Sequence, residues 1–284
     1  MKPTRIAAAV REALAPWPAI APGFRQLRHL SRWRSSVLPA GTRDALGVSL
    51  TDAAKWQGGV LGPDGKIYGI PRNATNILII DPISGTATRD DLGASLTGTA
   101  KWLGGVLGPD GKIYGIPANA ADILIIDPIS GTATRSVMGA TLTGAAKWFG
   151  GVLGPDGKIY GIPHNATDIL IIDPISGTAT RSVMGATLTD ATKWQGGVVG
   201  PDGKIYGIPQ DATDILIIDP IAGTATRDAL DANLTGPLKW QGGVLGPDGK
   251  IYGIPRNATN ILIAENFPNL LSVNAALSPY LNKF

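Results

Sequence analysis

The sequence predicts an all-β fold made of five copies of one four-stranded unit, and three observations support this. A Lys-Trp pair recurs every 46 residues, with its tryptophans at Trp56, Trp102, Trp148, Trp194 and Trp240. Each pair opens the same string, KWxGGVLGPDGKIYGIPxNATxILIIDPISGTATR, in which short apolar runs alternate with Gly, Pro and Asp turn signals. No part of this string has helical periodicity. Repeated units of this length with four short strands are typical of the blades of a β-propeller, so a five-bladed β-propeller is expected.

The first predicted hairpin of each unit joins a glycine-rich strand to an apolar one. In the first unit, residues 58–62 lead into the turn Pro63-Asp64-Gly65 and then into a strand over residues 66–70. Glycines suit an inner strand, because side chains have little room at the axis of a propeller. We assign Asp64 and its equivalents to the turn, since Pro-Asp-Gly is a turn sequence in its own right. A fivefold cation or sugar site at these aspartates is the alternative.

The second predicted hairpin carries the outer part of the blade. Residues 77–80 are apolar on both faces, residues 81–85 form the turn, and residues 86–89 make a polar outer strand. We assign the single Trp and Tyr of each unit to packing between blades, with stacking on sugar rings as the alternative.

The two ends of the chain predict how the ring closes. The fifth unit leaves the template after Ile263 and lacks a fourth strand. Residues 42–44, Thr-Arg-Asp, lie 46 positions before the Thr-Arg-Asp of residues 88–90. Residues 37–45 are therefore expected to supply the missing strand, which would remove the exposed sheet edges.

The repeated string resembles a known group of proteins. KWxGGVLxPxGKIYGIPxNxTxxLIIDP is similar to the units of repeat-array β-propellers of unicellular eukaryotes, and the match covers about residues 42–284. The final LSPYLNKF is also similar to the way such arrays end. This resemblance implies a propeller fold and no assigned activity. More distantly, the PDGKIY hairpin and the DPxSG turn are similar to NHL- and YVTN-type propellers, which are mostly binding platforms.

The composition excludes several classes of function. The 284 residues include no Cys and two His, which rules out disulfide scaffolds, zinc ribbons, iron–sulfur sites and Cys nucleophiles. No apolar run is long enough for a membrane-spanning helix. Residues 1–48 hold eight Lys and Arg against two acids, so the basic excess lies in a short head and no nucleic acid partner is expected. We expect no enzyme activity, no catalytic residue, no cofactor and no metal.

The head, residues 1–36, is a predicted basic amphipathic segment, followed by the propeller at residues 37–265 and an apolar tail at residues 266–284. On a helix over residues 24–38, the apolar stripe includes Phe24, Leu27, Leu30 and Trp33. An Arg-rich, acid-poor head is typical of an organelle transit segment, with the mitochondrion as first expectation and the plastid as second. In the alternative, the head is retained and docks on a membrane surface or in a partner's groove.

Two positions differ in chemistry between otherwise near-identical units. The position after YGIP holds Arg72, Ala118, His164, Gln210 and Arg256. The position after each Trp holds Gln57, Leu103, Phe149, Gln195 and Gln241. We expect the first set in loops on a propeller face, and Leu103 with Phe149 in an exposed apolar patch that suits a protein partner. Neutral drift is the alternative.

These features favour a non-enzymatic scaffold or binding module, an accessory subunit that joins protein partners in a larger organellar assembly. The alternative is a multivalent carbohydrate-binding propeller of lectin type with one site per blade. Its sites would use Asn73, Tyr68, Trp56 and their equivalents, which recur in the units.

Overall fold

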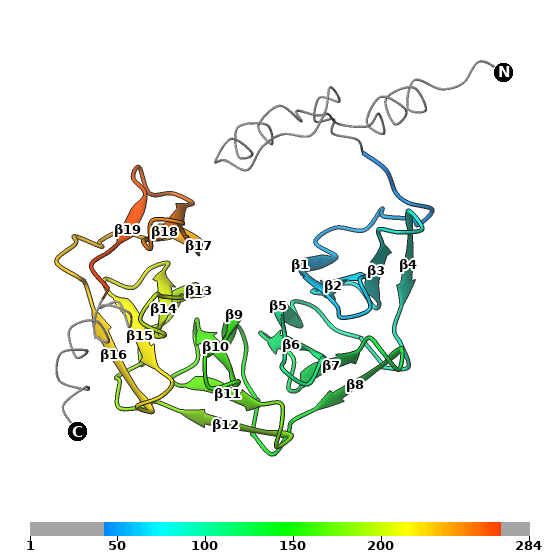
Figure 1. Cartoon of the computed structure of the whole chain (residues 1–284), viewed down its shortest axis with the longest axis horizontal. Helices are drawn as coiled ribbons and strands as arrows, with labels where there is room; N and C mark the ends of the chain where they lie inside the picture. The colour runs from blue at the N-terminus through cyan, green and yellow to red at the C-terminus, as the bar shows by residue number, and fades with distance from the viewer. Residues whose placement is uncertain (1–42, 268–284) are drawn as a thin grey trace, which may run out of the picture. The chain divides into compact units, whose positions relative to one another are not determined.

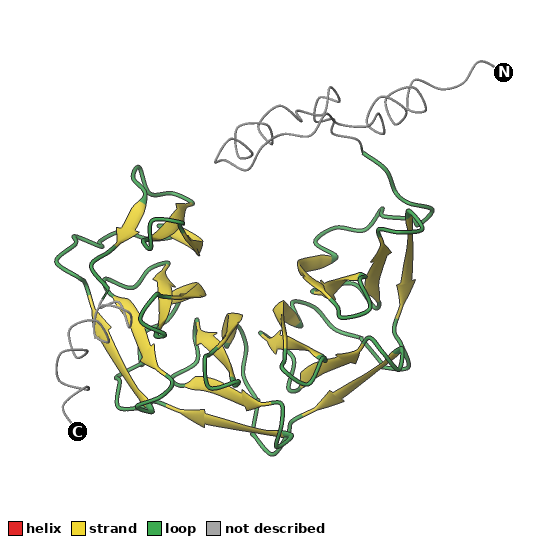
Figure 2. Cartoon of the chain, viewed as in Figure 1, coloured by secondary structure: helices red, strands yellow, loops and turns green. Residues whose placement is uncertain are grey.

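The computed structural model of the chain describes residues 43–267. Nearly all of them belong to one compact unit that begins at Ala45. Among the described residues every regular element is a β-strand, as the repeat predicts (Figure 2). Within residues 43–267 no helix has the length and apolar character needed to cross a membrane.

The strands follow the repeat. The first sheet holds β1 (Trp56–Leu61), β2 (Ile67–Pro71), β3 (Ile77–Asp81) and β4 (Thr86–Asp90), and the second holds β5 (Trp102–Leu107), β6 (Ile113–Pro117), β7 (Ile123–Asp127) and β8 (Thr132–Ser136). The third holds β9 (Trp148–Leu153), β10 (Ile159–Pro163), β11 (Ile169–Asp173) and β12 (Thr178–Ser182), and the fourth holds β13 (Trp194–Val199), β14 (Ile205–Pro209), β15 (Ile215–Asp219) and β16 (Thr224–Asp228). The fifth holds β17 (Trp240–Leu245), β18 (Ile251–Pro255) and β19 (Leu262–Ala264).

Each sheet is antiparallel, with its strands in sequence order. The first strands β1, β5, β9, β13 and β17 face the inside of the arc that the sheets form, and each contacts the next (Figure 1). Glycines make this close approach possible: a Cβ on Gly58 would lie 3.2 Å from the Cα of Gly104, and one on Gly196 would lie 3.1 Å from the Cα of Gly242. The expectation that the inner glycines serve a crowded axis is confirmed.

The turn aspartates have structural partners, as expected. Asp64 accepts a hydrogen bond from the Tyr68 hydroxyl at 2.8 Å and one from the Lys66 backbone at 3.2 Å. Asp81 accepts the backbone N–H groups of Ile83 and Ser84 at 2.9 and 3.1 Å, and these bonds, that of Ser84 first, lower the pKa of its carboxyl. The same bonds recur in the second and third sheets, so both aspartates close turns.

The apolar core lies between neighbouring sheets. Trp148 of the third sheet is fully buried with Ile116 and Ile123 of the second, and Trp102 and Trp194 occupy the same place in their own sheets. The indole N–H of Trp148 donates to the carbonyl of Asp168 at 2.8 Å. Packing between blades is therefore the confirmed role of these tryptophans.

The lysines before the second, third and fourth tryptophans join their sheets to the preceding sheet, which the sequence did not predict. Lys147 is buried, and its ammonium donates to the carbonyls of Ala118 and Ala120 in the second sheet's loop, at 2.7 and 2.8 Å. A third bond, to the carbonyl of Gly144, measures 2.9 Å. Burial lowers the pKa of Lys147 to about 8, as it does for Lys101 and Lys193.

The last sheet has three strands within the described residues. Residues 37–42 lie outside the described part of the chain, and residues 43–45 are not in a strand, so closure by an N-terminal strand stays a prediction. The 46-residue spacing itself extends ahead of the first sheet within the described residues. The carbonyl of Leu46 accepts the N–H of Ala87 at 2.9 Å, as the carbonyl of Leu92, 46 residues later, accepts that of Ala133 at 2.8 Å.

The outer face of the fifth sheet is exposed. Ile254 is 49% exposed, whereas its equivalent Ile116 is 0% exposed because the next sheet covers it. Val244, Ile261 and Ile263 of the fifth sheet are also more than half exposed, at 59%, 57% and 51%.

Candidate functional site

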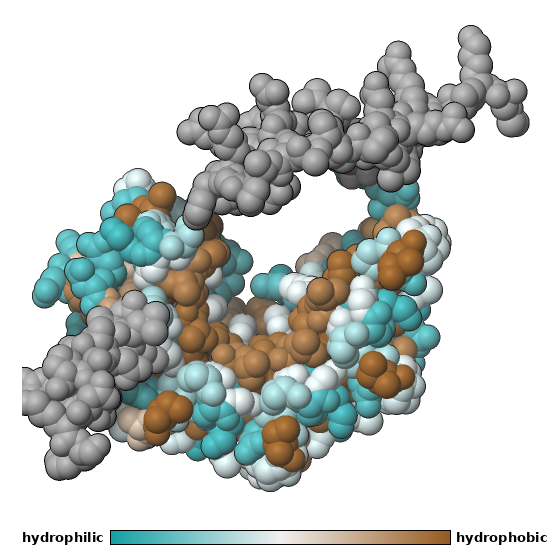
Figure 3. Space-filling view, in the orientation of Figure 1, coloured by the Kyte–Doolittle hydropathy of each residue, from teal (hydrophilic) through white to brown (hydrophobic). Residues whose placement is uncertain are grey.

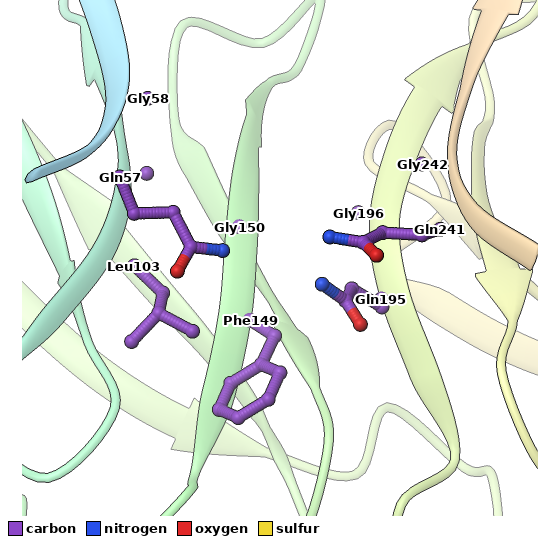
Figure 4. Close-up of a pocket in the computed structure, with 10 residues that line it drawn as sticks. Gln57, Gly58, Leu103, Phe149, Gly150, Gln195, Gly196, Gln241 and Gly242 are labelled. Atoms are coloured by element: carbon purple, nitrogen blue, oxygen red, sulfur yellow. The ribbon is translucent and has the colours of Figure 1, made fainter. Parts of the chain in front are cut away.

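The two variable positions of the repeat lie next to each other at the inner side of the sheets. The position after each Trp falls in a β-bulge, because three steps on β1 from Trp56 to Gly59 pair with two steps on β2. The bulge recurs in all five sheets. A bulge re-aims side chains, and here it turns the variable residue towards the axis (Figure 4). Gly58 completes the bulge with a φ of +80°.

The position after YGIP is held at the same place by the backbone. The N–H of His164 donates to the carbonyl of Lys147 in its own sheet at 2.8 Å, and its carbonyl accepts the N–H of Lys193 in the next sheet at 3.0 Å. Equivalent bonds hold Ala118 and Gln210. The residue after the proline therefore stays beside the inner strand.

A cavity of about 230 Å³ lies among the inner strands. Its lining comes from all five sheets: the variable residues Gln57, Leu103, Phe149, Gln195 and Gln241, and the glycine after each. Leu103 and Phe149 form an apolar wall on two neighbouring sheets, and the amides of Gln57, Gln195 and Gln241 reach towards it from the other sheets (Figure 4). The space-filling view shows apolar residues along the inner rim of the arc (Figure 3).

A stacked pair supports the apolar wall. The rings of Phe149 and His164 have centroids 3.8 Å apart and planes inclined by 17°. His164 is 5% exposed, and its Nε2 lies 3.3 Å from Nε2 of Gln210, which is 3% exposed. Gln210 Oε1 is buried without a hydrogen-bond partner in the described part of the chain. Burial lowers the pKa of His164, so the imidazole is neutral at pH 7.

The remaining residues that follow YGIP differ in their exposure. Ala118 is fully buried beside Leu103's sheet, whereas Arg256 on the fifth sheet is exposed. Arg72 is half-buried, and its Nε has no hydrogen-bond partner among the described residues. Neither arginine lines the cavity.

These positions correct two expectations about exposure. Leu103 is 6% exposed and Phe149 is half-buried, so they do not form an exposed patch. Ala118, His164 and Gln210 are buried rather than displayed in face loops. The physical reason is the pairing of β2 with the inner strand, Trp56 opposite Pro71, which keeps the next residue at the axis. That the two sets bind a partner stays a prediction.

The recurring residues that the carbohydrate hypothesis would use make contacts within the protein. Tyr68 is buried with its hydroxyl bonded to Asp64, and the Oδ1 of Asn73 accepts the N–H of Ala100 at 2.8 Å. The tryptophans of the second to fourth sheets are fully buried. The buried tryptophans and tyrosines of these sheets therefore leave no ring face for a sugar, whereas Asn119 and Asn165 are exposed and Trp56 is half-buried.

Other sequence-predicted features fall elsewhere. Phe24, Leu27, Leu30 and Trp33 of the predicted amphipathic helix lie outside the described residues. Within residues 43–267, no three His, Cys, Asp or Glu side chains are grouped so that they could hold a metal ion. The sequence indicates only part of the cavity. Its variable residues stand out among the repeats, but the two glycines that follow each of them do not by themselves predict a bulge.

Comparison with known proteins supports the fold. The chain is similar to a catalytically inactive virginiamycin B lyase from Staphylococcus aureus with quinupristin, at TM-score 0.57 and 20% identity over 78% of this chain and 74% of that chain. A streptogramin B lyase structure gives TM-score 0.57 and 19% identity, covering 79% and 73% of the two chains. An auxiliary nutrient binding protein from Bacteroides ovatus gives TM-score 0.53 and 16% identity, covering 76% and 61%.

At these identities the likeness shows a propeller-like fold alone. No protein-family model matches the chain, and no curated protein matches it. The resemblance to repeat-array propellers of unicellular eukaryotes therefore stays a prediction, while the β-propeller fold class is supported by the solved structures.

Proposed function

We propose that this chain is a non-catalytic binding module whose site is the axial cavity. One observation carries the proposal: within the string that runs from Lys-Trp to the outer strand, the two positions that differ most in chemistry between the repeats are the two that meet at the axis. The backbone holds Gln, Leu or Phe equally well in the same bulge. The side chains at this position are therefore not dictated by the fold.

The arrangement suits one ligand rather than five. A ring of identical blades would present five equal pockets, but here the second and third sheets supply an apolar wall and the others supply amides. A pocket that is largely apolar, with a few polar groups that fix orientation, is the usual form of a small-molecule site. The propeller-like relatives add support, since one was solved with quinupristin and another is named a nutrient binding protein.

The experiment compares the native chain with a variant whose axis is made uniform. Leu103→Gln with Phe149→Gln gives all five sheets the same residue after Trp. Ser136→Asp with Ser182→Asp is the matched control, because it makes the second and third sheets match the first and fourth at the end of the outer strand. A diverse library of small molecules is screened by thermal shift on all three proteins. Compounds that stabilise the native chain and the control but not the uniform variant are expected; compounds that act equally on all three contradict the proposal.

A second candidate is an accessory subunit with a protein partner, in the mitochondrion or a plastid. The observation that favours a protein partner is the exposed face of the fifth sheet, where Val244, Ile254 and Ile261 lack the cover that their equivalents have. In a closed ring the first sheet would cover this face, so a partner bound here and closure of the ring exclude each other. Native electrophoresis of the protein from its source, with mass spectrometry of its N-terminal peptide, tests this. Migration with a larger complex is expected, and a lone species near 29 kDa contradicts it.

A further inference from the structure

We infer that the axial cavity takes an uncharged, flat molecule of one or two rings that carries an amide-like hydrogen-bonding group. This inference rests on the proposed function and specifies the ligand class of the same site. It follows from four properties of the lining: its charge, its shape, its hydrogen-bonding groups and its size.

None of the described residues that line the cavity has a charged side chain. The nearest ionisable ring, His164, is covered by Phe149 and kept neutral by burial. A charged ligand would leave water here without gaining a counter-charge, which is costly. The lining therefore selects against carboxylates, phosphates and amines.

A flat ligand fits the apolar wall. Phe149 lines the cavity beside Leu103 (Figure 4), and its stack on His164 restrains the ring there. A preorganised aromatic face favours an aromatic ring or another planar group. Sugars, with hydroxyls all around the ring, would need more polar partners than this wall provides.

The opposite side supplies paired donors and acceptors. The side-chain amides of Gln57, Gln195 and Gln241 make no hydrogen bond within the described part of the chain. Each offers an N–H donor and a carbonyl acceptor, so the best complement is a group with both, such as a carboxamide, a lactam or the edge of a nucleobase. The cavity of about 230 Å³ lies below the range of about 300–1,000 Å³ of drug-sized pockets, which limits the ligand to one or two rings.

Benzamide, benzoate and glucose are the probes, measured by ligand-observed NMR titration of the full chain. Benzamide is expected to bind, with benzoate at least about tenfold weaker and glucose not detected. Phe149→Ala and Gln195→Leu should each weaken benzamide binding by about tenfold. Ile129→Ala, at a side chain 75% exposed and away from the cavity lining, is the control and should leave binding unchanged.

The outcomes distinguish a wrong ligand class from a wrong binding site. If benzoate or glucose binds as tightly as benzamide, the proposed ligand class is wrong but the site is not. The same holds if benzamide does not bind while the binding of library compounds still depends on Leu103 and Phe149. If benzamide binds equally well to the Phe149→Ala and Gln195→Leu chains, and no library compound depends on the axial residues, the proposed function fails too. Should Phe149→Ala not fold, Gln195→Leu decides alone, because the Gln195 side chain makes no hydrogen bond within residues 43–267.

Discussion

Phe149 lies flat on His164, with ring centroids 3.8 Å apart. These residues occupy the two positions at which the repeats differ most, 15 residues apart in one sheet, and they meet because a bulge and a proline-ended strand bring both to the axis. The contact means that the two variable positions form one layered site. A substitution at either position changes the surroundings of the other.

The buried lysines give a direct test of how the sheets are joined. Lys147→Met removes the donor from three carbonyls, those of Ala118, Ala120 and Gly144, and is expected to lower the free energy of unfolding by about 3 kcal/mol. Lys158→Met is the matched control, because Lys158 lies in the first turn of the same sheet and its ammonium makes no hydrogen bond in the described part of the chain, so its effect should be within about 0.5 kcal/mol. Urea unfolding of both variants measures the difference, and equal losses would contradict the role of Lys147.

Two glycines separate the two costs of adding a methyl group, backbone strain and crowding. Gly196 and Gly177 both have positive φ, +74° and +67°, but a Cβ on Gly196 would lie 3.1 Å from the Cα of Gly242, while one on Gly177, in the turn between β11 and β12, meets nothing within 4 Å. Gly177→Ala should therefore cost about 1 kcal/mol from backbone strain alone, and Gly196→Ala about 3 kcal/mol from strain and crowding. Thermal unfolding of the two variants gives the comparison; a smaller loss at Gly196 would show that the inner strands are not closely packed.

Stability should depend on pH in the alkaline range through the same lysines. Burial lowers the pKa of Lys101, Lys147 and Lys193 to about 8 in the folded chain, whereas an unfolded lysine titrates near 10.5. Between these values the unfolded chain binds more protons, so the free energy of unfolding rises as pH increases from 8 towards 10. Above pH 10 it should fall, because burial and the bond to aspartate raise the pKa of Tyr114 and its equivalents.

Urea midpoints measured from pH 7 to 11 test this shape. Lys147→Met should show a smaller rise between pH 8 and 10, since one of the contributing groups is gone. A midpoint that declines steadily from pH 7 would contradict the burial of the lysines.

Most of the fold could be predicted from the sequence. The period of 46 residues, the turn chemistry of Pro-Asp-Gly and Asp-Pro, and the apolar runs define four strands and their order. The role of Lys147 could not be read from the repeat, because a lysine beside a tryptophan is usually exposed, and its burial depends on carbonyls of a neighbouring sheet.

The candidate site was predictable only as a set of variable positions. The sequence identified Leu103, Phe149, His164 and Gln210, but their burial follows from how β1 and β2 pair and where the bulge falls. A loop position and an inner position look alike in sequence when both follow a strand. Three-dimensional pairing was needed to place them at the axis.

Closure of the last sheet can be tested by crosslinking, because the chain has no Cys of its own. In the first sheet Ile79 pairs with Thr88, and the same register in the fifth would pair Ile263 with Thr42. The pair Thr42→Cys and Ile263→Cys should form a disulfide under mild oxidation. Gly41→Cys with Ile263→Cys is the control, since a shift of one residue points the side chain to the other face. Crosslinking of the control alone, or of neither pair, would contradict closure in this register.

The measurement that tests the axial site most directly is the number of ligand molecules bound per chain, read by native mass spectrometry with the tightest library compound. One molecule is expected on the native chain and on the Ser136→Asp, Ser182→Asp control, and none on the Leu103→Gln, Phe149→Gln variant, because the cavity is lined by one unequal set of side chains. Several equivalent molecules per chain, or undiminished binding to the variant with a uniform axis, would contradict a single asymmetric site.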